Sequence, residues 1–291
     1  MSDFVDVGYV NQYKNNLIMF VQQKGARLNG LAMEEPWVGE YAYFDILKPT
    51  AAREREARHE DTTYSNTENK RRRAEKKVYF DAELVDPKLD LHNMLIDPTS
   101  KYAVNQGWAM GRSKDDVLIA AFTATAYEGK DGSSSVAFPT ATQQIATSSL
   151  NLNYIKILQA GQKFVDNEYD EDNLKMVVSG SAVTSLLQQN EAKSIDYNTI
   201  KPLVEGKVVR FGGFDIIRHG RLPKTSNTRS CYAWHPAAMG FGIGDNMETT
   251  IDRLPGKHNN IQIYTSASYG AVRILDEGVV EILVDESAGP A

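Results

Sequence analysis

The residues that could do nucleophilic or acid–base chemistry are few and lie far apart in this sequence. Cys231 and His235 are close enough along the chain to suggest a nucleophile and its base. The segment around them alternates like a β-strand, which predicts a buried thiol that behaves as a small hydrophobic group. No third group that would orient the histidine can be identified, so we predict no catalysis at this pair. The sequence as a whole predicts a protein that is not an enzyme.

Metal and phosphate sites are not predicted either. The histidines form neither an H-x-x-x-H nor an H-E-x-x-H pair, the spacings with which a helix binds zinc. The glycines of "GFGIGDN" (240–246) could cradle a phosphate, but the chain soon reaches Pro255 without an amphipathic helix, so we predict a structural turn. The acidic segment "DNEYDED" (166–172) lacks the glycine and the spacing of a calcium loop and is predicted to be a solvated helix end. We therefore predict no cofactor.

The most distinctive segment is the charged run "REREARHEDTTYSNTENKRRRAEKK" (53–77). Nine of its 25 residues are basic and six are acidic, which is typical of a solvated segment or of one that contacts another molecule. Its second half, "NKRRRAEKK", could bind nucleic acid. Its first half interleaves carboxylates with arginines, so opposite charges would face each other across a hairpin. We therefore favour a mixed-charge surface that contacts protein.

The two segments that flank the charged run alternate with the period of a β-strand. We predict that they pair with each other as antiparallel strands and carry the run as the tip of a projecting arm. An isolated two-stranded ribbon is only marginally stable in water, so such an arm is expected to lie on another surface. Each strand is predicted to bury one apolar face, formed by Ala42, Phe44 and Ile46 before the run and by Val78, Phe80, Ala82 and Leu84 after it.

Helical and strand patterns follow one another through the rest of the chain, which predicts an α+β (mixed α/β) fold. Before the charged run, a short amphipathic helix is predicted from about residue 10 to Gly25. After it, residues 100–127 predict two helices, or one helix broken near Gly111. In that prediction Ser113 and Asp116 form a capping box at the start of the second helix.

From residue 149 onward, helices alternate with short strands. "LKMVVSG" (174–180) predicts a buried strand, and the helix that follows is capped by Ser179 or Ser181. The other predicted elements are a helix that carries Ile155, Leu158, Phe164 and Val165, a strand pair that turns at Gly212 and Gly213, a strand followed by a turn at Pro236, and two closing strands.

The composition is that of a globular protein with a sizeable core. The chain has 291 residues, of which 42% are hydrophobic and 24% charged, so it can form one large or two medium domains. Its net charge of −6 argues against wholesale binding of nucleic acid. The single cysteine excludes an intramolecular disulfide and fits a reducing compartment. An acidic start, and no apolar stretch of roughly 20 residues, predict a soluble cytosolic chain with no signal peptide and no membrane contact.

Four sets of segments, taken in their order and spacing, resemble parts of a known family. They are "AMGRSKDDVLIAAF" (109–122), "LKMVVSGSAVTSLLQQ" (174–189), "FGGFDIIRHGRLP" followed by "SCYAWHPAAMGFGIG" (211–244), and "IQIYTSASYGAVRILDEGVVEI" (261–282). In that order, they are similar to four parts of the major capsid proteins of tailed bacteriophages. These parts are the spine helix; the apical strand and helix; the strand, loop and alanine-rich turn; and the closing strands. The resemblance covers nearly the whole chain and rests on the order of the segments, because each alone is degenerate.

The resemblance implies a Hong Kong 97-like capsid fold and the function of a major capsid protein. Such a protein self-assembles in the host bacterial cytoplasm into the icosahedral head shell of a virion, which encloses double-stranded DNA. Its implied partners are other copies in hexamers and pentamers, a portal, decoration proteins, DNA bound non-specifically and, because the chain starts close to the arm, a separate scaffolding protein. The implied parts are an N-terminal arm (1–35), an extended β-hairpin loop (36–86), a peripheral domain with the spine helix (87–148 and 245–274) and an apical domain (149–244 and 275–291).

In this resemblance the charged run is the tip of the extended loop and contacts a neighbouring subunit. Two alternatives stay open: an encapsulin-type compartment shell, which is similar in fold, and a DNA-binding protein that uses Lys70 to Lys77. An α/β hydrolase or transferase is a third alternative, but it lacks an identifiable nucleophile and base. The predicted inter-subunit contact residues are Arg53, Arg55, Arg58, Glu60, Asp61, Lys70, Arg71, Arg72, Arg73, Lys76 and Lys77.

Overall fold

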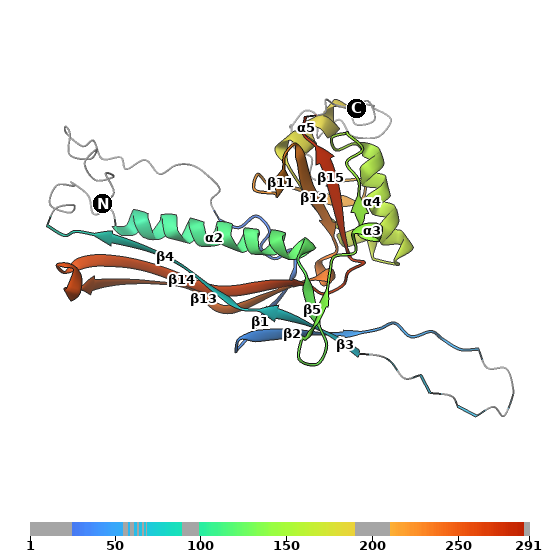
Figure 1. Cartoon of the computed structure of the whole chain (residues 1–291), viewed down its shortest axis with the longest axis horizontal. Helices are drawn as coiled ribbons and strands as arrows, with labels where there is room; N and C mark the ends of the chain where they lie inside the picture. Colours follow the sequence, from blue (N-terminus) through green and yellow to red (C-terminus); the bar gives the residue numbers. More distant parts are fainter. Residues whose placement is uncertain are drawn as a thin grey trace.

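The protein is elongated, with a helix-and-sheet body at one end of a long sheet and a hairpin that projects away from both (Figure 1). The predicted helix that ends at Gly25 and part of the charged run lie outside the described residues. The computed structural model describes residues 25–54, 58, 61, 62, 64, 65, 67, 69–88, 99–189 and 210–287.

The long sheet has the strand order β1-β13-β14-β4. β13 (Met239–Leu254) and β14 (Asn260–Arg273) form a long antiparallel hairpin, β4 (Lys77–Val85) pairs antiparallel with β14, and β1 (Met33–Pro36) pairs parallel with β13. Helix α2 (Thr99–Thr123) lies along one face of this sheet (Figure 1).

Helix α2 is one continuous helix of 25 residues, so the predicted break at Gly111 and the predicted capping box are wrong. Neither Gly107 nor Gly111 ends the helix, and Gly111 allows close packing. A Cβ atom on Gly111 would lie 2.7 Å from the Cα atom of Gly25, so only glycine lets the N-terminal segment cross the helix this closely. One turn further on, the carboxylate of Asp115 accepts hydrogen bonds from the backbone N–H groups of Arg27 and Leu28.

The second body is a seven-stranded sheet covered by helices (Figure 1). The predicted strand at 174–180 is confirmed as β8, and the next helix is capped by Ser179, whose Oγ accepts from the N–H of Ala182. The strand pair around Gly212 and Gly213 is also confirmed, with both glycines at positive φ. The elements are α3 (Thr140–Gln143), β7 (Gln144–Ile145), α4 (Tyr154–Asp166), β8 (Lys175–Val178), α5 (Gly180–Gln188), β9 (Arg210–Phe211), β10 (Phe214–Arg218), β11 (Lys224–Thr225), β12 (Thr228–Trp234) and β15 (Val279–Asp285), with short 3₁₀ turns at Glu171–Asn173 and Pro236–Ala238. A third short 3₁₀ turn, Pro255–Lys257, joins β13 to β14 in the long sheet.

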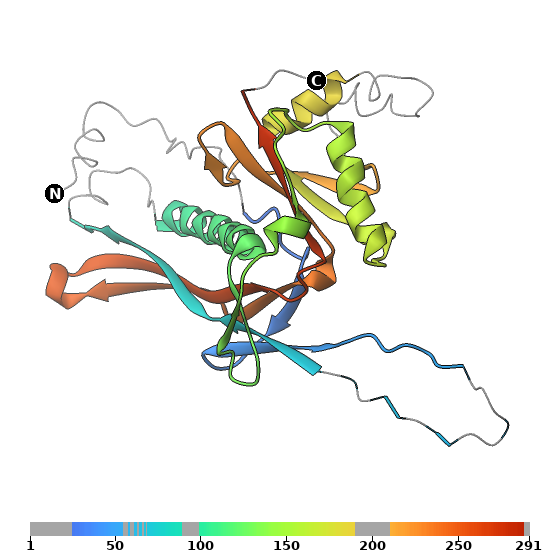
Figure 2. The ribbon, with the colours of Figure 1, turned by 45° about the vertical axis from the view of Figure 1, so that its right-hand side comes forward.

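The third sheet carries the projecting hairpin, which Figure 2 shows extending away from the rest of the molecule. Its order is β2 (Tyr41–Leu47), β3 (Asn69–Glu75), β5 (Ala126–Glu128) and β6 (Ser134–Val136). The predicted pairing of the two flanking strands is wrong. β2 pairs with β3, which comes from the charged run itself, because the chain changes sheets at Lys76 and leaves β4 to pair with β14. The charged hairpin is therefore β2, β3 and the residues between them.

The glycine-rich segment 240–246 does not form the predicted turn, and helix α4 leaves part of its apolar surface exposed. Gly240 and Gly242 lie in β13, not in a turn, and their missing side chains leave room for the rings of Phe44 and Trp37. Helix α4 buries the face that carries Ile157, Ala160 and Phe164. The predicted helix is confirmed, and three of its other apolar residues are exposed: Ile155, Leu158 and Val165.

Candidate functional site: the charged hairpin and its anchor

The three consecutive arginines of the hairpin point to opposite faces of strand β3. Side chains alternate along a strand, so Arg71 and Arg73 lie on the outer face while Arg72 and Ala74 lie on the inner face. Arg72 is only 4% exposed and Ala74 only 1%. The prediction that Lys70 to Arg73 belong to the tip of the hairpin is therefore wrong, because all four lie in a strand at its base.

The outer face of the hairpin is a layer of tyrosines and arginines. Arg71 donates to both carboxylate oxygens of Asp45, at 2.5 and 3.1 Å, and lies 5.3 Å over the ring of Tyr43. These hydrogen bonds hold the pKa of Asp45 below its ordinary value. Arg73 lies 4.6 Å from the ring centre of Tyr41 and 5.1 Å from that of Tyr127. Tyrosine and arginine dominate the energetics of many protein interfaces, so this face is suited to contact protein.

The inner face of the hairpin is anchored by a buried ion-pair network that we call the arginine bridge. Nη2 of Arg72 lies 2.7 Å from Asp276 and 3.1 Å from Glu128. The other oxygen of Asp276 accepts from Nε of Arg273 at 2.6 Å, and the other oxygen of Glu128 lies 3.0 Å from Lys70. Three cations thus share two carboxylates beneath the hairpin.

A small apolar cluster lies beside the arginine bridge and packs the hairpin onto the long sheet. Its inward residues from β2 and β3 confirm the predicted burial of the Phe44 face. We call it the anchor cluster, and its buried members are Trp37, Phe44, Ala74, Ala126, Val272 and Ile274.

The remaining predicted contact residues are spread along the hairpin and beyond it. Arg53, Arg58 and Asp61 are exposed in the described part of the loop, while Arg55 and Glu60 lie outside the described residues. The Nζ atom of Lys76 lies 3.8 Å from Asp245. Lys77 is exposed at the start of β4.

Sequence reasoning missed the acidic partners of these cations. Asp276 and Glu128 are distant from the hairpin along the chain, so no local pattern indicated them. The buried position of Arg72 did have a signal, because the alternation of "NKRRRAE" places it on the same face as Ala74.

One face of β4 forms a second exposed surface. The predicted set Val78, Phe80, Ala82 and Leu84 shares one face, but that face is not buried in the single chain. Val78 is 64% exposed, Phe80 66% and Leu84 48%. The opposite face of β4 packs beneath α2 through Tyr79, which stacks on Tyr269 at 4.6 Å. An exposed apolar surface of this kind marks a site of interaction.

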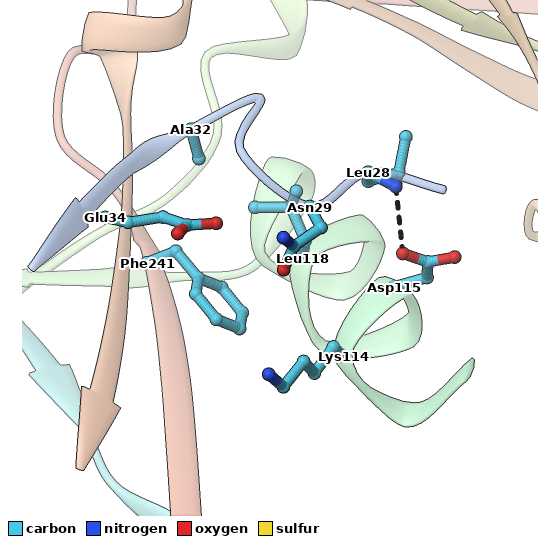
Figure 3. Close-up of a pocket in the computed structure, with 8 residues that line it drawn as sticks. All are labelled: Leu28, Asn29, Ala32, Glu34, Lys114, Asp115, Leu118 and Phe241. Atoms are coloured by element: carbon cyan, nitrogen blue, oxygen red, sulfur yellow. Dashed lines mark hydrogen bonds between the residues drawn. The ribbon is translucent and has the colours of Figure 1, made fainter. Parts of the chain in front are cut away.

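One small pocket lies beside helix α2. Figure 3 shows a cavity between α2, β13 and residues 28–34, and its volume of about 10 Å³ holds no more than one water molecule. At its edge Nε2 of His219 lies 3.2 Å from Asp115. Burial raises the pKa of Asp115, but the hydrogen bonds from His219 and from two backbone N–H groups outweigh it and leave the pKa below its ordinary value.

The structure places the candidate nucleophile inside the protein. Cys231 is completely buried in β12, and burial raises the pKa of its thiol to about 12. Among the described residues, no three His, Cys, Asp or Glu side chains are grouped so that they could hold a metal ion. In the same part of the chain, no helix combines the length and the apolar character that a bilayer crossing requires.

The fold and the exposed hairpin define a structural protein of the Hong Kong 97-like capsid type. Solved structures that share this fold over nearly their whole length include the capsid of Cyanophage P-SCSP1u (TM-score 0.73, 13% identity, covering 96% of this chain and 94% of that one). The capsid of Cyanophage Pam1 matches with a TM-score of 0.74 at 8% identity, over 99% and 100% of the two chains. The acidic stable capsid of Helicobacter pylori bacteriophage KHP30 matches with a TM-score of 0.74 at 8% identity, over 98% of each.

The family follows from the sequence comparison. The model of a phage capsid protein family matches residues 5–286, so this chain belongs to the phage capsid protein family and is a subunit of a phage head shell. A search of curated proteins gave no match. The family match favours a phage capsid over the encapsulin alternative.

Proposed function

We propose that this chain is the major capsid protein of a tailed phage and assembles in the bacterial cytoplasm, as hexamers and pentamers, into an icosahedral shell around double-stranded DNA. The observation that carries the proposal is the family match over residues 5–286. The division into an N-terminal arm (1–35), an extended loop (36–86), a peripheral domain (87–148 and 245–274) and an apical domain (149–244 and 275–291) belongs to the same proposal.

The charged hairpin is the part of the subunit that we assign to contacts between copies. It projects away from its own body (Figure 2), and a two-stranded ribbon needs a surface to stabilise it. Its outer face offers Tyr43, Arg71 and Arg73, and its loop offers Arg53, Arg58 and Asp61. We exclude Arg72 from the proposed contact residues, because its guanidinium pairs with Asp276 of the same chain.

Other partners follow from the same assignment. A net charge of −6 fits a shell wall that touches packaged DNA only non-specifically. A portal, a scaffolding protein and decoration proteins would be further partners of such a shell.

Expression of the protein alone and together with its neighbouring genes, followed by negative-stain electron microscopy, tests the proposal. Closed shells in either preparation are the expected result. A protein that stays monomeric in both would contradict it. A monomer that binds DNA with a strongly salt-dependent affinity would instead support the DNA-binding alternative.

A charge-neutralised variant tests the assignment of the hairpin. In the double variant Arg71→Gln, Arg73→Gln we expect fewer closed particles and unchanged folding, because both side chains lie on the outer face. Lys257→Gln is the matched control, since Lys257 is exposed at the turn between β13 and β14, at the opposite end of the molecule (Figure 1). Normal particle yield from the double variant would rule out the outer face as a contact.

A further inference from the structure

The arginine bridge joins the hairpin to the end of helix α2. Arg273 is completely buried, and its Nη1 donates to the carbonyl oxygens of Phe122 and Ala124 at 2.8 and 2.9 Å. These carbonyls lie at the C-terminal end of α2, where a cation is favoured. Asp276 holds Nε of Arg273 with one oxygen and Nη2 of Arg72 with the other. A rigid chain of charged hydrogen bonds thus runs from β3 to α2.

The apolar contacts beneath the hairpin fix its direction less well. The anchor cluster has six buried members, of which Ala74 and Ala126 have small side chains. Apolar burial is non-directional, whereas the charged contacts of Nη2 of Arg72 join β3 to two specific carboxylates, those of Asp276 and Glu128. Two open grooves, of about 500 and about 550 Å³, border the end of β2 at Ile46 and Leu47. The end of β2 therefore lies beside open space.

We propose that Arg72, held by Asp276 and Glu128, is the positioning residue that sets the direction of the hairpin and thereby the angle between neighbouring subunits. The inference rests on the proposed shell function, in which the hairpin of one copy reaches the next. Such head-to-tail contacts close into a ring or shell only when the angle between copies is correct. A change in hairpin direction therefore alters shell geometry.

The stability that Arg72 contributes is small compared with its geometric role. Within the described residues, its Nε and Nη1 atoms are buried without a hydrogen-bond partner, and such groups are costly to bury. Replacing buried ion pairs by apolar groups is often neutral or even stabilising. The residue is thus better explained by the direction it imposes than by the free energy it adds.

The variant Arg72→Met tests this role without stranding a buried charge. After the substitution Glu128 keeps Lys70 and Asp276 keeps Arg273, so each carboxylate retains a cation and we expect the subunit to fold. Lys257→Met is the control, because it removes an exposed cation at the turn between β13 and β14, away from the hairpin. Arg72→Lys restores the positive charge on a shorter side chain, and we expect it to rescue the variant in part.

Hydrogen exchange of the soluble subunit and electron microscopy of assembled particles give the two readouts. In Arg72→Met we expect amides of β2 and β3 to exchange about tenfold faster, with those of β8 and β12 unchanged, because a charged hydrogen bond at the hairpin base is lost. We also expect a broader distribution of particle diameters than in the wild type and in Lys257→Met.

Two outcomes overturn the inference. One is an Arg72→Met protein whose exchange and particle diameters match the wild type, and the other is an equal broadening in Lys257→Met. Failure of the wild type to form shells contradicts the proposed function instead, and the exchange measurement on the soluble subunit still tests whether Arg72 holds the hairpin.

Discussion

Asp276 accepts a hydrogen bond from Arg72 at 2.7 Å, although 204 residues separate the two in the chain. The contact brings the base of the charged hairpin to the turn between β14 and β15. It also explains why one arginine of a solvated run is buried while its two neighbours stay on the surface. Because the same carboxylate holds Arg273, its removal affects two buried cations at once.

Asp276→Asn is expected to destabilise the subunit strongly. Arg273 would lose its only carboxylate partner in the network, and Arg72 would depend on Glu128 alone. Leaving a buried charge without its partner costs about 3–5 kcal/mol in the free energy of unfolding. Urea unfolding at neutral pH measures this loss of unfolding free energy.

Glu277→Gln is the matched control for Asp276→Asn. Glu277 is the next residue in the same turn and is exposed, so its free energy of unfolding should stay close to that of the wild type. If Asp276→Asn lowers the free energy of unfolding by less than about 1 kcal/mol, the ion pairs of Asp276 contribute no more than an exposed surface pair. That result would contradict the arginine bridge.

Gly242→Ala is expected to displace Trp37 from the anchor cluster. A Cβ atom at this position would overlap the indole ring of Trp37, and overpacking of a core site typically costs about 1–3 kcal/mol. Thermal unfolding and the tryptophan emission spectrum measure the effect.

Gly256→Ala is the control for Gly242→Ala, because a Cβ atom there meets nothing within 4 Å. Unchanged stability and an unchanged emission spectrum in Gly242→Ala would show that the ring of Trp37 does not lie on β13.

The local elements of this fold were predictable where short-range patterns decide them. The cap at Ser179 and the turn at Gly212 and Gly213 have signals within a few residues. Helix α2 was wrongly broken because the helix propensity of glycine counts against Gly111. The benefit of that glycine lies in the close approach of Gly25, which only the folded chain shows.

The long-range pairings and the arginine bridge were not predictable. A strand's pattern gives the face it buries but not the strand it pairs with, so β2 was assigned to β4 and not to β3. The alternation of β4 was recognised, yet Phe80 stays exposed among the described residues. The partners of Arg72 come from two distant segments, and their acidic side chains are unremarkable in the sequence.

Phe80→Ser is expected to impair assembly while leaving the isolated subunit stable. Phe80 is 66% exposed, and its ring centre lies 6.0 Å from that of Tyr264. The free energy of unfolding of the subunit should therefore fall by no more than about 1 kcal/mol. If another copy covers this face, loss of the ring raises the protein concentration needed for assembly, which light scattering measures.

Val38→Ser is the control for Phe80→Ser. Val38 is fully exposed and lies outside the β4 face, so this variant should assemble as the wild type does. Equal assembly of all three proteins would show that the face of β4 is not an interface.

Lys156 is a buried lysine that joins α4 to the seven-stranded sheet. It is 4% exposed, and its Nζ atom donates to the carbonyl oxygens of Thr147, Leu150 and Leu283 at 2.8 to 2.9 Å. Burial lowers the pKa of Lys156 to about 8. The carbonyls of Thr147 and Leu150 also accept from backbone N–H groups, so Lys156→Met leaves neither without a partner.

The pH dependence of stability should therefore differ between the wild type and Lys156→Met. Between the folded pKa of about 8 and the ordinary value of 10.5, the unfolded wild-type chain binds more protons at this lysine than the folded one. Wild-type stability relative to the variant should thus be flat below pH 8 and rise above it, by up to about 3 kcal/mol. Urea unfolding from pH 7 to pH 10 measures this difference, with the surface variant Lys257→Met as control. A difference that stays constant with pH, or falls, would mean that the ammonium group of Lys156 is not buried as the structure shows.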